Sequence, residues 1–363
     1  MTVKILAVIT TGFFSWGGLA TVMMNYYRAM DKTGINIDFA SDNVTEASLI
    51  EELNKNGSIY FKLPNRKKHT FSYMVQMYRL LKKEKYDVIH IHGNSGTMIF
   101  DLLPGYLSKI PKRIIHVHST INQHPYFNKM FKPLMLALST DKLAVSKEAG
   151  NYLYGMNSYT ILNNAIDAKY YRFDKELRIN CRLKLGFDME DYIIGTVGKI
   201  NASKNHAYLV DIFAKVKRIR ANAKLLIVGD GKLRADIEKQ IKFLELSDSC
   251  ILTGMQNDVK EFLSAMDLFV FPSVFEGFGL SLLEAQASGL PCVCSSVIPD
   301  SACATDLCNK YPLDNMQKWV DYIVSFKPEE NREILSNKAY KQILDKGLEI
   351  NRQSEHLKRI YEM

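Results

Sequence analysis

The chain has 363 residues, enough for two domains of ordinary size, each with its own core. No apolar run approaches the roughly 18–20 residues of a membrane span, so the sequence argues against a membrane-spanning protein. The net charge of +8 lies in residues 1–170, where 20 Lys and Arg accompany 12 Asp and Glu, whereas residues 171–363 carry 27 of each. With no nucleic-acid-binding motif beside it, this basic half favours a membrane surface or a pyrophosphate-linked acceptor and not a nucleic acid.

The first half alternates apolar runs with amphipathic stretches, which predicts an α/β domain with a parallel sheet. Residues 3–9 are expected to form a buried first strand and not a signal peptide, because Gly12 follows where a strand turns. Residues 122–139 are expected to form helix and loop, as a plain core helix or as a lining for the acceptor. The expected strands are residues 3–9, 37–40, 58–63, 86–92, 114–118 and 142–146, and the expected helices follow Gly18 or cover 47–57, 71–83 and 147–154.

Gly17 and Gly18 precede the first amphipathic helix. Glycines at a helix N-terminus allow a phosphate to approach the backbone, although such a pair is equally common in simple turns. The glycines do not form a GxGxxG pattern, which argues against a nicotinamide dehydrogenase.

Basic residues gather around the helix expected at 71–83, which we predict to bury Phe71, Met74, Val75, Met77, Tyr78 and Leu81. Cations at the end of a helix commonly do no more than complement its dipole. Together with the preceding basic loop they also suggest a patch for anionic lipid headgroups. The patch comprises Arg66, Lys67, Lys68, Arg79, Lys82, Lys83 and Lys85.

Two expected strands end in histidines, as YDVIHIH and IIHVH. His90 and His116 lie inside their strands and are expected to be satisfied core residues. His92 and His118 stand at the carboxyl ends, where open α/β sheets bind ligands.

A second α/β pattern begins with a strand at 192–197 and continues with strands at 225–228 and 251–254 and a helix at 259–266. Lys199 and Lys204 follow its first strand, and Gly229 follows its second. Cations at a strand end predict a clamp for a pyrophosphate, and the alternative is a solvated lysine pair.

Residues 268–296 form the most informative stretch: a buried strand at 268–271, a glycine-containing loop, a helix at 280–287 and another strand starting at Pro291. Free amides and the helix dipole at the start of that helix predict an anion site. Glu276 and Glu284 bracket the site, and carboxylates there suit hydroxyl groups and not phosphate. Phosphate together with hydroxyls describes a nucleotide sugar.

This stretch resembles the donor-site signature of the retaining GT-B glycosyltransferases of family 4: P-S-x-x-E-G-F-G, two glutamates with seven residues between them, then E-A-x-A-x-G-x-P. The resemblance implies two Rossmann-like parallel-sheet domains that face each other across a cleft. Residues 1–170 would form the acceptor domain and 171–345 the donor domain, with a helix at 346–363 that packs back on the first domain.

The resemblance also implies roles for individual residues. Glu276 would meet hydroxyls of the transferred sugar, and Glu284 the ribose diol. Lys199 and Lys204 would hold the pyrophosphate, and His118 the donor sugar near the reaction centre. Further donor contacts would come from Gly17, Gly18, Gly229, Gly277, Phe278, Gly279 and Leu280, and His92 would be a candidate on the acceptor side.

The chain departs from the family pattern at several positions. Lys199 replaces an arginine and therefore lacks the bidentate guanidinium that the arginine would offer. Asn205 and Ala165 each replace a glycine. Residues 297–306, VIPDSACATD, lack the glycines of the family's further donor loop, a form that resembles an exopolysaccharide and capsule branch.

The expected activity is retaining transfer of a hexose or N-acetylhexosamine from a nucleoside diphosphate sugar, with UDP favoured, to a saccharide or lipid-linked acceptor of surface polysaccharide synthesis. The alternatives are a sugar-nucleotide epimerase or hydrolase of the same architecture, or a non-catalytic binding scaffold.

No cofactor beyond the donor and no metal site are expected, because the chain has no D-x-D in strand context and its six cysteines have no zinc-like spacing. We expect these cysteines to be free thiols in a reducing cytoplasm, with the protein at the inner face of the plasma membrane as a further hypothesis.

Overall fold

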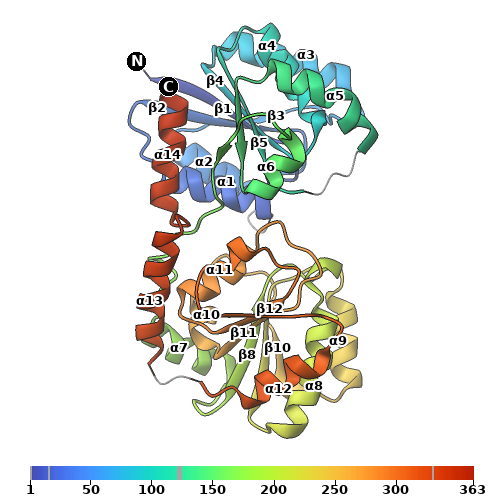
Figure 1. Cartoon of the computed structure of the whole chain (residues 1–363), viewed down its shortest axis with the longest axis vertical. Coiled ribbons are helices and arrows are strands. Elements are labelled where there is room, and N and C mark those ends of the chain that lie inside the picture. Colours follow the sequence, from blue (N-terminus) through green and yellow to red (C-terminus); the bar gives the residue numbers. More distant parts are fainter. Residues whose placement is uncertain (1, 15–16, 121–124, 329–330) are drawn as a thin grey trace. The chain divides into compact units, whose positions relative to one another are not determined.

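The computed structural model describes residues 2–14, 17–120, 125–328 and 331–363. The chain divides into two compact units, Met1–Ala165 with Ile350–Met363 (unit 1) and Ile166–Glu349 (unit 2) (Figure 1). The boundaries expected from the sequence, after residues 170 and 345, lie within five residues of these divisions. None of the described helices is long and apolar enough to cross a membrane.

In its described part, unit 1 contains a seven-stranded parallel sheet in the order β3-β2-β1-β4-β5-β6-β7. The order reverses between β1 and β4, which pair Ile9 with His92, so the carboxyl ends of these strands border the position where open α/β sheets bind ligands. The strands are β1 (Val3–Ile9), β2 (Ile35–Ser41), β3 (Tyr60–Lys62), β4 (Val88–Gly93), β5 (Lys112–Val117), β6 (Asp141–Ala144) and β7 (Thr160–Ile161).

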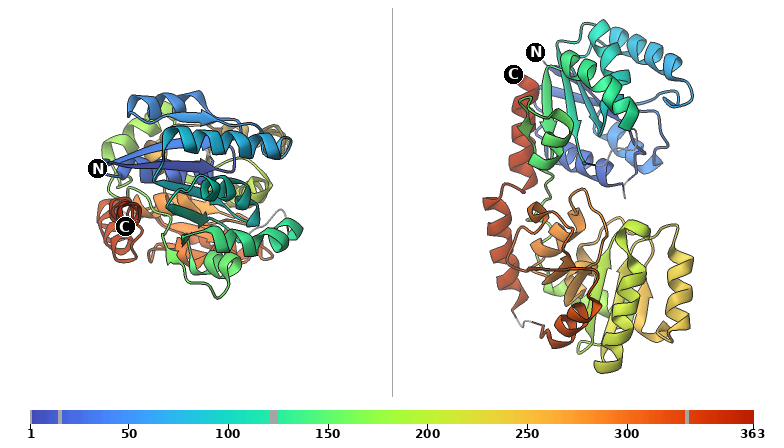
Figure 2. Two further views of the ribbon diagram at one scale, coloured as in Figure 1. Left: turned by 90° about the horizontal axis from the view of Figure 1, so that it is seen from above. Right: turned by 45° about the vertical axis from the view of Figure 1, so that its right-hand side comes forward.

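Helices cover both faces of this sheet (Figure 2). Side chains such as Leu6 and Ile91 share one core with the α3–α6 side, whereas α1 and α14 contact each other over the opposite face. Residues 350–363 thus complete the layer that α1 begins, and Lys358 of α14 forms an ion pair with Asp31 at 2.7 Å. The helices are α1 (Gly18–Ala29), α2 (Ala47–Lys55), α3 (Thr70–Glu84), α4 (Ile99–Leu107), α5 (Pro125–Leu138), α6 (Lys147–Tyr154) and α14 (Ile350–Glu362).

The buried face of α3 differs from the predicted one. Tyr73, Met77 and Leu81 form the buried stripe, whereas Phe71 is 82% exposed and Tyr78 is also exposed. The hydroxyl of Tyr73 donates to the buried carboxylate of Asp101 on α4. Local periodicity does not contain this long-range contact, which together with the packing of Met77 and Leu81 in the core matches the observed rotation of the helix.

Unit 2 has a six-stranded parallel sheet over its described residues, in the order β10-β9-β8-β11-β12-β13. The order reverses between β8 and β11, which pair Ile194 with Leu268. The strands are β8 (Tyr192–Val197), β9 (Ala223–Val228), β10 (Cys250–Leu252), β11 (Leu268–Phe271), β12 (Cys292–Ser295) and β13 (Cys308–Tyr311). The helices are α7 (Lys175–Leu185), α8 (His206–Ile219), α9 (Arg234–Phe243), α10 (Lys260–Ala265), α11 (Leu280–Ala287), α12 (Met316–Ser325) and α13 (Arg332–Asp345).

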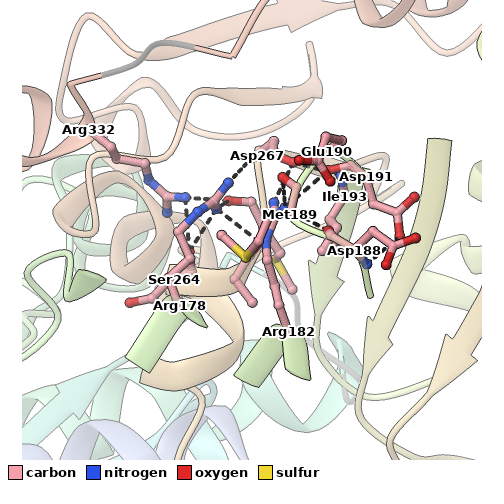
Figure 3. A network of polar contacts seen from close by, with 12 residues as sticks. Arg178, Arg182, Asp188, Met189, Glu190, Asp191, Ile193, Ser264, Asp267 and Arg332 are labelled. Carbon is pink, nitrogen blue, oxygen red and sulfur yellow. Dashed lines mark hydrogen bonds and ion pairs between the residues drawn. The ribbon is translucent and has the colours of Figure 1, made fainter. Parts of the chain in front are cut away.

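A buried polar network fixes α7, α10 and α13 at the amino-terminal edge of this sheet (Figure 3). Asp267, immediately before β11, accepts from Arg178 at 2.6 Å and from the fully buried Arg182 at 2.7 Å. Arg332 donates to carbonyls that include those of Leu263 and Ser288, and burial lowers the pKa of its guanidinium to about 9. The carbonyls at the end of α10 therefore share in balancing three cations that face one carboxylate.

Candidate functional site

The loops that leave the carboxyl edge of the unit 2 sheet hold the predicted donor residues. After β8, Gly198 donates its amide to Val228 at 2.9 Å, and the loops after β8 and β9 pack backbone to backbone. A Cβ on Gly229, whose φ is +145°, would lie 2.0 Å from the carbonyl oxygen of Gly198. Gly229 is therefore needed both for its conformation and for its close approach to the backbone of Gly198.

Lys204 and Glu276, predicted from separate motifs, meet in one ion pair. Lys204 Nζ lies 2.7 Å from Glu276 Oε1 and 4.3 Å from the ring centroid of Phe271. Ser203 holds the two loops together, because its carbonyl accepts from the Val274 amide at 2.8 Å and its hydroxyl donates to the Phe275 carbonyl at 2.6 Å. The ammonium and the carboxylate thus form a preorganised pair of opposite charge at the sheet edge.

Asn205 keeps the local geometry that a glycine has in the family pattern. Its φ of 55° places it in the left-handed region, which asparagine tolerates better than most residues. Asn201 accepts from the Lys204 amide at 3.0 Å and closes the short turn before α8. Lys199 lies half-buried on the same loop as Lys204. Ala165 does not adopt a positive φ, so its replacement of a glycine adds no backbone strain.

The N-terminus of α11 presents backbone donors without a competing side chain. Gly279 precedes the helix with φ of +93°, and no side-chain cap bonds to the first turn in the described structure. The amides of Leu282 and Leu283 already bond to the Gly279 carbonyl, which leaves those of Leu280 and Ser281 at the helix start. These amides and the helix dipole favour an anion at this point. Gly277 is exposed in the preceding loop, whereas Phe278 is buried beneath it.

Glu284 lies one turn into the same helix and is 7% exposed. Burial raises the pKa of its carboxyl to about 7, and a hydrogen bond from Tyr171 and the charge of Lys204 oppose that rise. Hydroxyl groups that donate hydrogen bonds to this carboxyl would stabilise its charged form and lower its pKa. The role of Tyr171 was not visible from the sequence, since it lies 113 positions earlier with no motif around it.

In unit 1, four histidines form one buried cluster on the α1 and α14 side of the sheet. His92 pairs with His116 in the strand register, and His92 Nδ1 lies 2.9 Å from His118 Nε2. The ring centroids are 4.0 Å apart for His90 and His92 and 4.2 Å apart for His116 and His118. Burial lowers the pKa of His118 to about 3, so its ring is neutral near pH 7 and acts as a hydrogen-bonding group, not as a charge.

The prediction that His90 and His116 are satisfied core residues is only half correct. His90 Nδ1 bonds to the hydroxyl of Tyr361 on α14 at 2.7 Å, but His90 Nε2 and both ring nitrogens of His116 lack a partner among the described residues. A cavity of about 30 Å³ beside His92 and His116 is large enough to hold a water.

Gly17 and Gly18 stand at the start of α1, again without a side-chain cap in the described structure. The φ of Gly17 is −87°, which any residue can adopt, and a Cβ on Gly18 would meet nothing within 4 Å. The two glycines therefore contribute an open helix N-terminus and no special turn.

The predicted basic patch divides into two parts. Arg66 forms an ion pair with the buried Asp101, so the prediction that it faces lipid headgroups is wrong, because its charge is used inside the fold. The other patch residues remain exposed, namely Lys67, Lys68, Arg79, Lys82, Lys83 and Lys85.

Helix α5 presents an exposed apolar stripe that the sequence reading did not predict. Tyr126 is 89% exposed and Met130 60% exposed, and Phe127 and Leu134 are also exposed. The helix is therefore not a plain core helix, and residues 122–124 of the predicted segment lie outside the described residues.

Comparisons with known proteins agree for both units. Residues 178–342 match the model described as "Glycosyl transferases group 1", and residues 16–169 match "Glycosyltransferase Family 4". The putative glycosyltransferase EpsF of Bacillus subtilis (strain 168) is 30% identical over 297 residues, which cover 78% of this chain and 77% of that protein. The UDP-Gal:alpha-D-GlcNAc-diphosphoundecaprenol alpha-1,3-galactosyltransferase of Escherichia coli is 24% identical over 79% of this chain and 78% of that protein.

Among solved structures, Anabaena Alr3699/HepE in complex with UDP and glucose matches with a TM-score of 0.80 at 13% identity, over 99% of this chain and 100% of that chain. This likeness and the two parallel sheets confirm the fold class predicted from the sequence, a GT-B arrangement of two Rossmann-like domains.

Proposed function

We propose that this chain, which belongs to glycosyltransferase family 4, transfers a hexose or N-acetylhexosamine from a UDP-sugar to a lipid-linked saccharide with retention of configuration at the anomeric carbon. Its activity as a glycosyltransferase that uses a nucleotide-sugar donor follows from the family. The single observation that carries the proposed binding of a nucleoside diphosphate sugar is the assembly in unit 2 of a cation, two acids and an open helix N-terminus.

The donor would bind by its three chemical parts. The pyrophosphate would take the α11 amides together with Lys204 and Lys199, because each stabilises negative charge. Glu276 would accept hydrogen bonds from the transferred sugar, and Glu284 from the ribose diol. The base would lie near Gly229, in the loop that follows β9.

The preference for a uridine nucleotide has support from relatives. The Escherichia coli relative is named for a UDP-galactose donor, and the Anabaena structure holds UDP and glucose. The site offers carboxylates that accept hydrogen bonds from sugar hydroxyls, and amides and ammonium groups that bind phosphate. Any nucleoside diphosphate sugar would use these groups, so the proposed preference for uridine rests on the relatives.

The chemical step would depend mainly on stabilising the leaving diphosphate. Negative charge grows on the departing oxygen while the anomeric carbon becomes oxocarbenium-like, and ammonium groups and amides lower the energy of that state. We propose that they supply the charge that a divalent metal supplies in other transferases. In a front-side retaining reaction the departing phosphate oxygen takes the acceptor proton, so no separate general base is needed. The neutral His118 would hold a hydroxyl of the donor sugar.

A lipid-linked acceptor is supported by the named substrate of the Escherichia coli relative, a GlcNAc diphosphoundecaprenol. It also suits the basic character of residues 1–170, since both its diphosphate and an anionic bilayer surface attract cations. The exposed apolar stripe of α5, with Tyr126 and Phe127, gives this unit a surface that could enter the headgroup region. We therefore propose action at the cytoplasmic face of the membrane in surface polysaccharide synthesis.

The experiment that tests the proposal separates donor use from transfer. A panel of UDP-, GDP- and dTDP-sugars is first screened by thermal shift, and the stabilising donors are then incubated with and without a diphosphoundecaprenol-linked sugar. We expect UDP release that depends on the acceptor and an α-linked product. UDP release without acceptor would indicate a hydrolase, a changed sugar nucleotide an epimerase, and no stabilisation by any donor a non-catalytic scaffold.

A further inference from the structure

Three of the six cysteines converge at one point of unit 2, although they are spread over 15 positions of the sequence. Cys294 lies one residue before the end of β12, Cys303 follows the turn Asp300–Ala302, and Cys308 begins β13. Their sulfur atoms lie 3.8 Å apart for Cys294 and Cys303, 3.7 Å for Cys294 and Cys308, and 3.1 Å for Cys303 and Cys308. Each thiol therefore has the other two as neighbours.

We propose that Cys294, Cys303 and Cys308 form a binding site for a thiophilic divalent cation, Zn²⁺ in particular. Zinc bonds thiolate sulfur at about 2.3 Å, and tetrahedral geometry then places two such sulfurs roughly 3.8 Å apart. Two of the three separations already have this value. The third requires Cys303 and Cys308 to move apart by about 0.7 Å, a small change because both side chains are only half-buried.

The surroundings suit a metal thiolate centre. Three thiolates and one divalent cation carry a net negative charge, and Lys310 lies beside them on β13, with its ammonium bonded to Asp300 at 2.6 Å and to the Ile298 carbonyl at 2.5 Å. The thiol of Cys308 donates to the sulfur of Cys303, so the three side chains already point at one another.

The described residues offer three ligands, so water would fill the fourth position on the half-exposed side. A simple disulfide between Cys303 and Cys308 would use two sulfurs and leave Cys294 without a role. Three mutually close sulfurs suit coordination of one metal ion, whereas a disulfide bond requires only two of them.

The bound ion would tie down the loop of residues 296–307. It would join the end of β12, the turn and the start of β13 at one point. The base of this loop also contacts the donor-side loop, since the hydroxyl of Ser295 donates to the Ser273 carbonyl at 2.5 Å. This site is independent of the proposed transferase reaction and would bind its ion whether or not that proposal is correct.

The test is metal binding by the full chain, purified under reducing conditions and stripped of metal. Cd²⁺ serves as the spectroscopic probe, through its sulfur-to-metal charge-transfer absorption, and Zn²⁺ is titrated in competition with a chromogenic chelator. We expect one ion per chain. Cys294→Ser, Cys303→Ser and Cys308→Ser should each weaken binding by more than the roughly 10- to 100-fold that the loss of an outer-shell partner costs. Cys250→Ser, which changes a thiol outside the cluster, is the matched control and should bind as the parent does.

A second measurement uses the unaltered chain and so does not depend on whether a variant folds. Zn²⁺ should slow alkylation of Cys294, Cys303 and Cys308, mapped by mass spectrometry, and leave the rate at Cys250 unchanged. Absence of the charge-transfer absorption, or equal binding by all four variants, would overturn the proposal. If the chain purified without reductant has four free thiols in place of six, with Cys303 and Cys308 joined, a disulfide would replace the proposed metal site.

Discussion

Removal of the Lys204 ammonium should reduce catalysis far more than it reduces stability. Lys204 retains 18% of its side-chain exposure and Glu276 13%, so the pair lies between a surface ion pair, worth about 0–1 kcal/mol, and a buried one, whose disruption costs about 3–5 kcal/mol. We therefore expect Lys204→Met to destabilise unit 2 by about 1–2 kcal/mol, or roughly 2–8 °C in Tm at 2–4 °C per kcal/mol. The loss of one preorganised donor to a developing anion, in contrast, costs about 3–4 kcal/mol of barrier, or roughly 100- to 1,000-fold in kcat.

The assay measures kcat and KM for UDP release with acceptor present, alongside thermal unfolding of the same samples. Lys204→Arg keeps the charge and should recover part of kcat, and Lys239→Met removes an exposed lysine of α9 as a matched control. Lys204→Met combined with Glu276→Gln should regain stability, because neither partner is left unpaired, without regaining turnover. A Lys204→Met enzyme with kcat within about tenfold of the parent would refute the role of Lys204 in stabilising the leaving group.

Four further predictions concern the same unit. Binding of a UDP-sugar should strengthen as pH rises through about 7, because the hydroxyls of the ribose favour the charged form of Glu284, and Glu284→Gln should abolish this dependence in calorimetric titrations. Because the folded state favours the neutral form of Glu284, the free energy of unfolding of the unliganded protein should fall as pH rises from about 4.5, the ordinary pKa of the side chain, to about 7. Thermal unfolding across that pH range would detect the fall. Asp267→Ala should destabilise unit 2 by about 3–5 kcal/mol in denaturant unfolding, since Arg182 is left buried and unpaired, and a loss under about 1 kcal/mol would contradict the network in Figure 3. Gly229→Ala should lower both Tm and nucleotide affinity, because its Cβ would collide with the Gly198 carbonyl, and unchanged affinity would show that the loop can move aside.

Local chemistry explains which parts of the fold could be predicted from the sequence. The β11–α11 segment carries its own signals, since Gly279 permits the turn into the helix and Pro291 follows the helix end, and both boundaries of α11 agree with the prediction. The donor motifs lie on such short strand-loop-helix units, so each could be recognised from its own local sequence. The ion pair of Lys204 with Glu276 therefore joins two residues that the sequence had already indicated.

Long-range contacts account for the features that the sequence did not reveal. Aromatic residues occur on two faces of α3, and long-range contacts decide which face is buried, among them the bond from Tyr73 to Asp101, 28 positions later, and the packing of Met77 and Leu81 in the core. The same carboxylate draws Arg66 away from the surface. The cysteine cluster likewise depends on the pairing of β12 with β13, because spacings of 9 and 14 residues match no metal-binding pattern.

The return of the chain to unit 1 has a consequence for the order in which the protein matures on the ribosome. Residues 166–349 are contiguous, so unit 2 holds all of its own sequence before α14 has been made. Unit 1, although its first 165 residues emerge earlier, must wait for residues 350–363 before Tyr361 can reach His90 and Lys358 can reach Asp31. The half that is translated first is therefore completed only by residues that are translated after the second half, and a chain that lacks residues 350–363 would leave the α1 side of the unit 1 sheet without its partner helix α14.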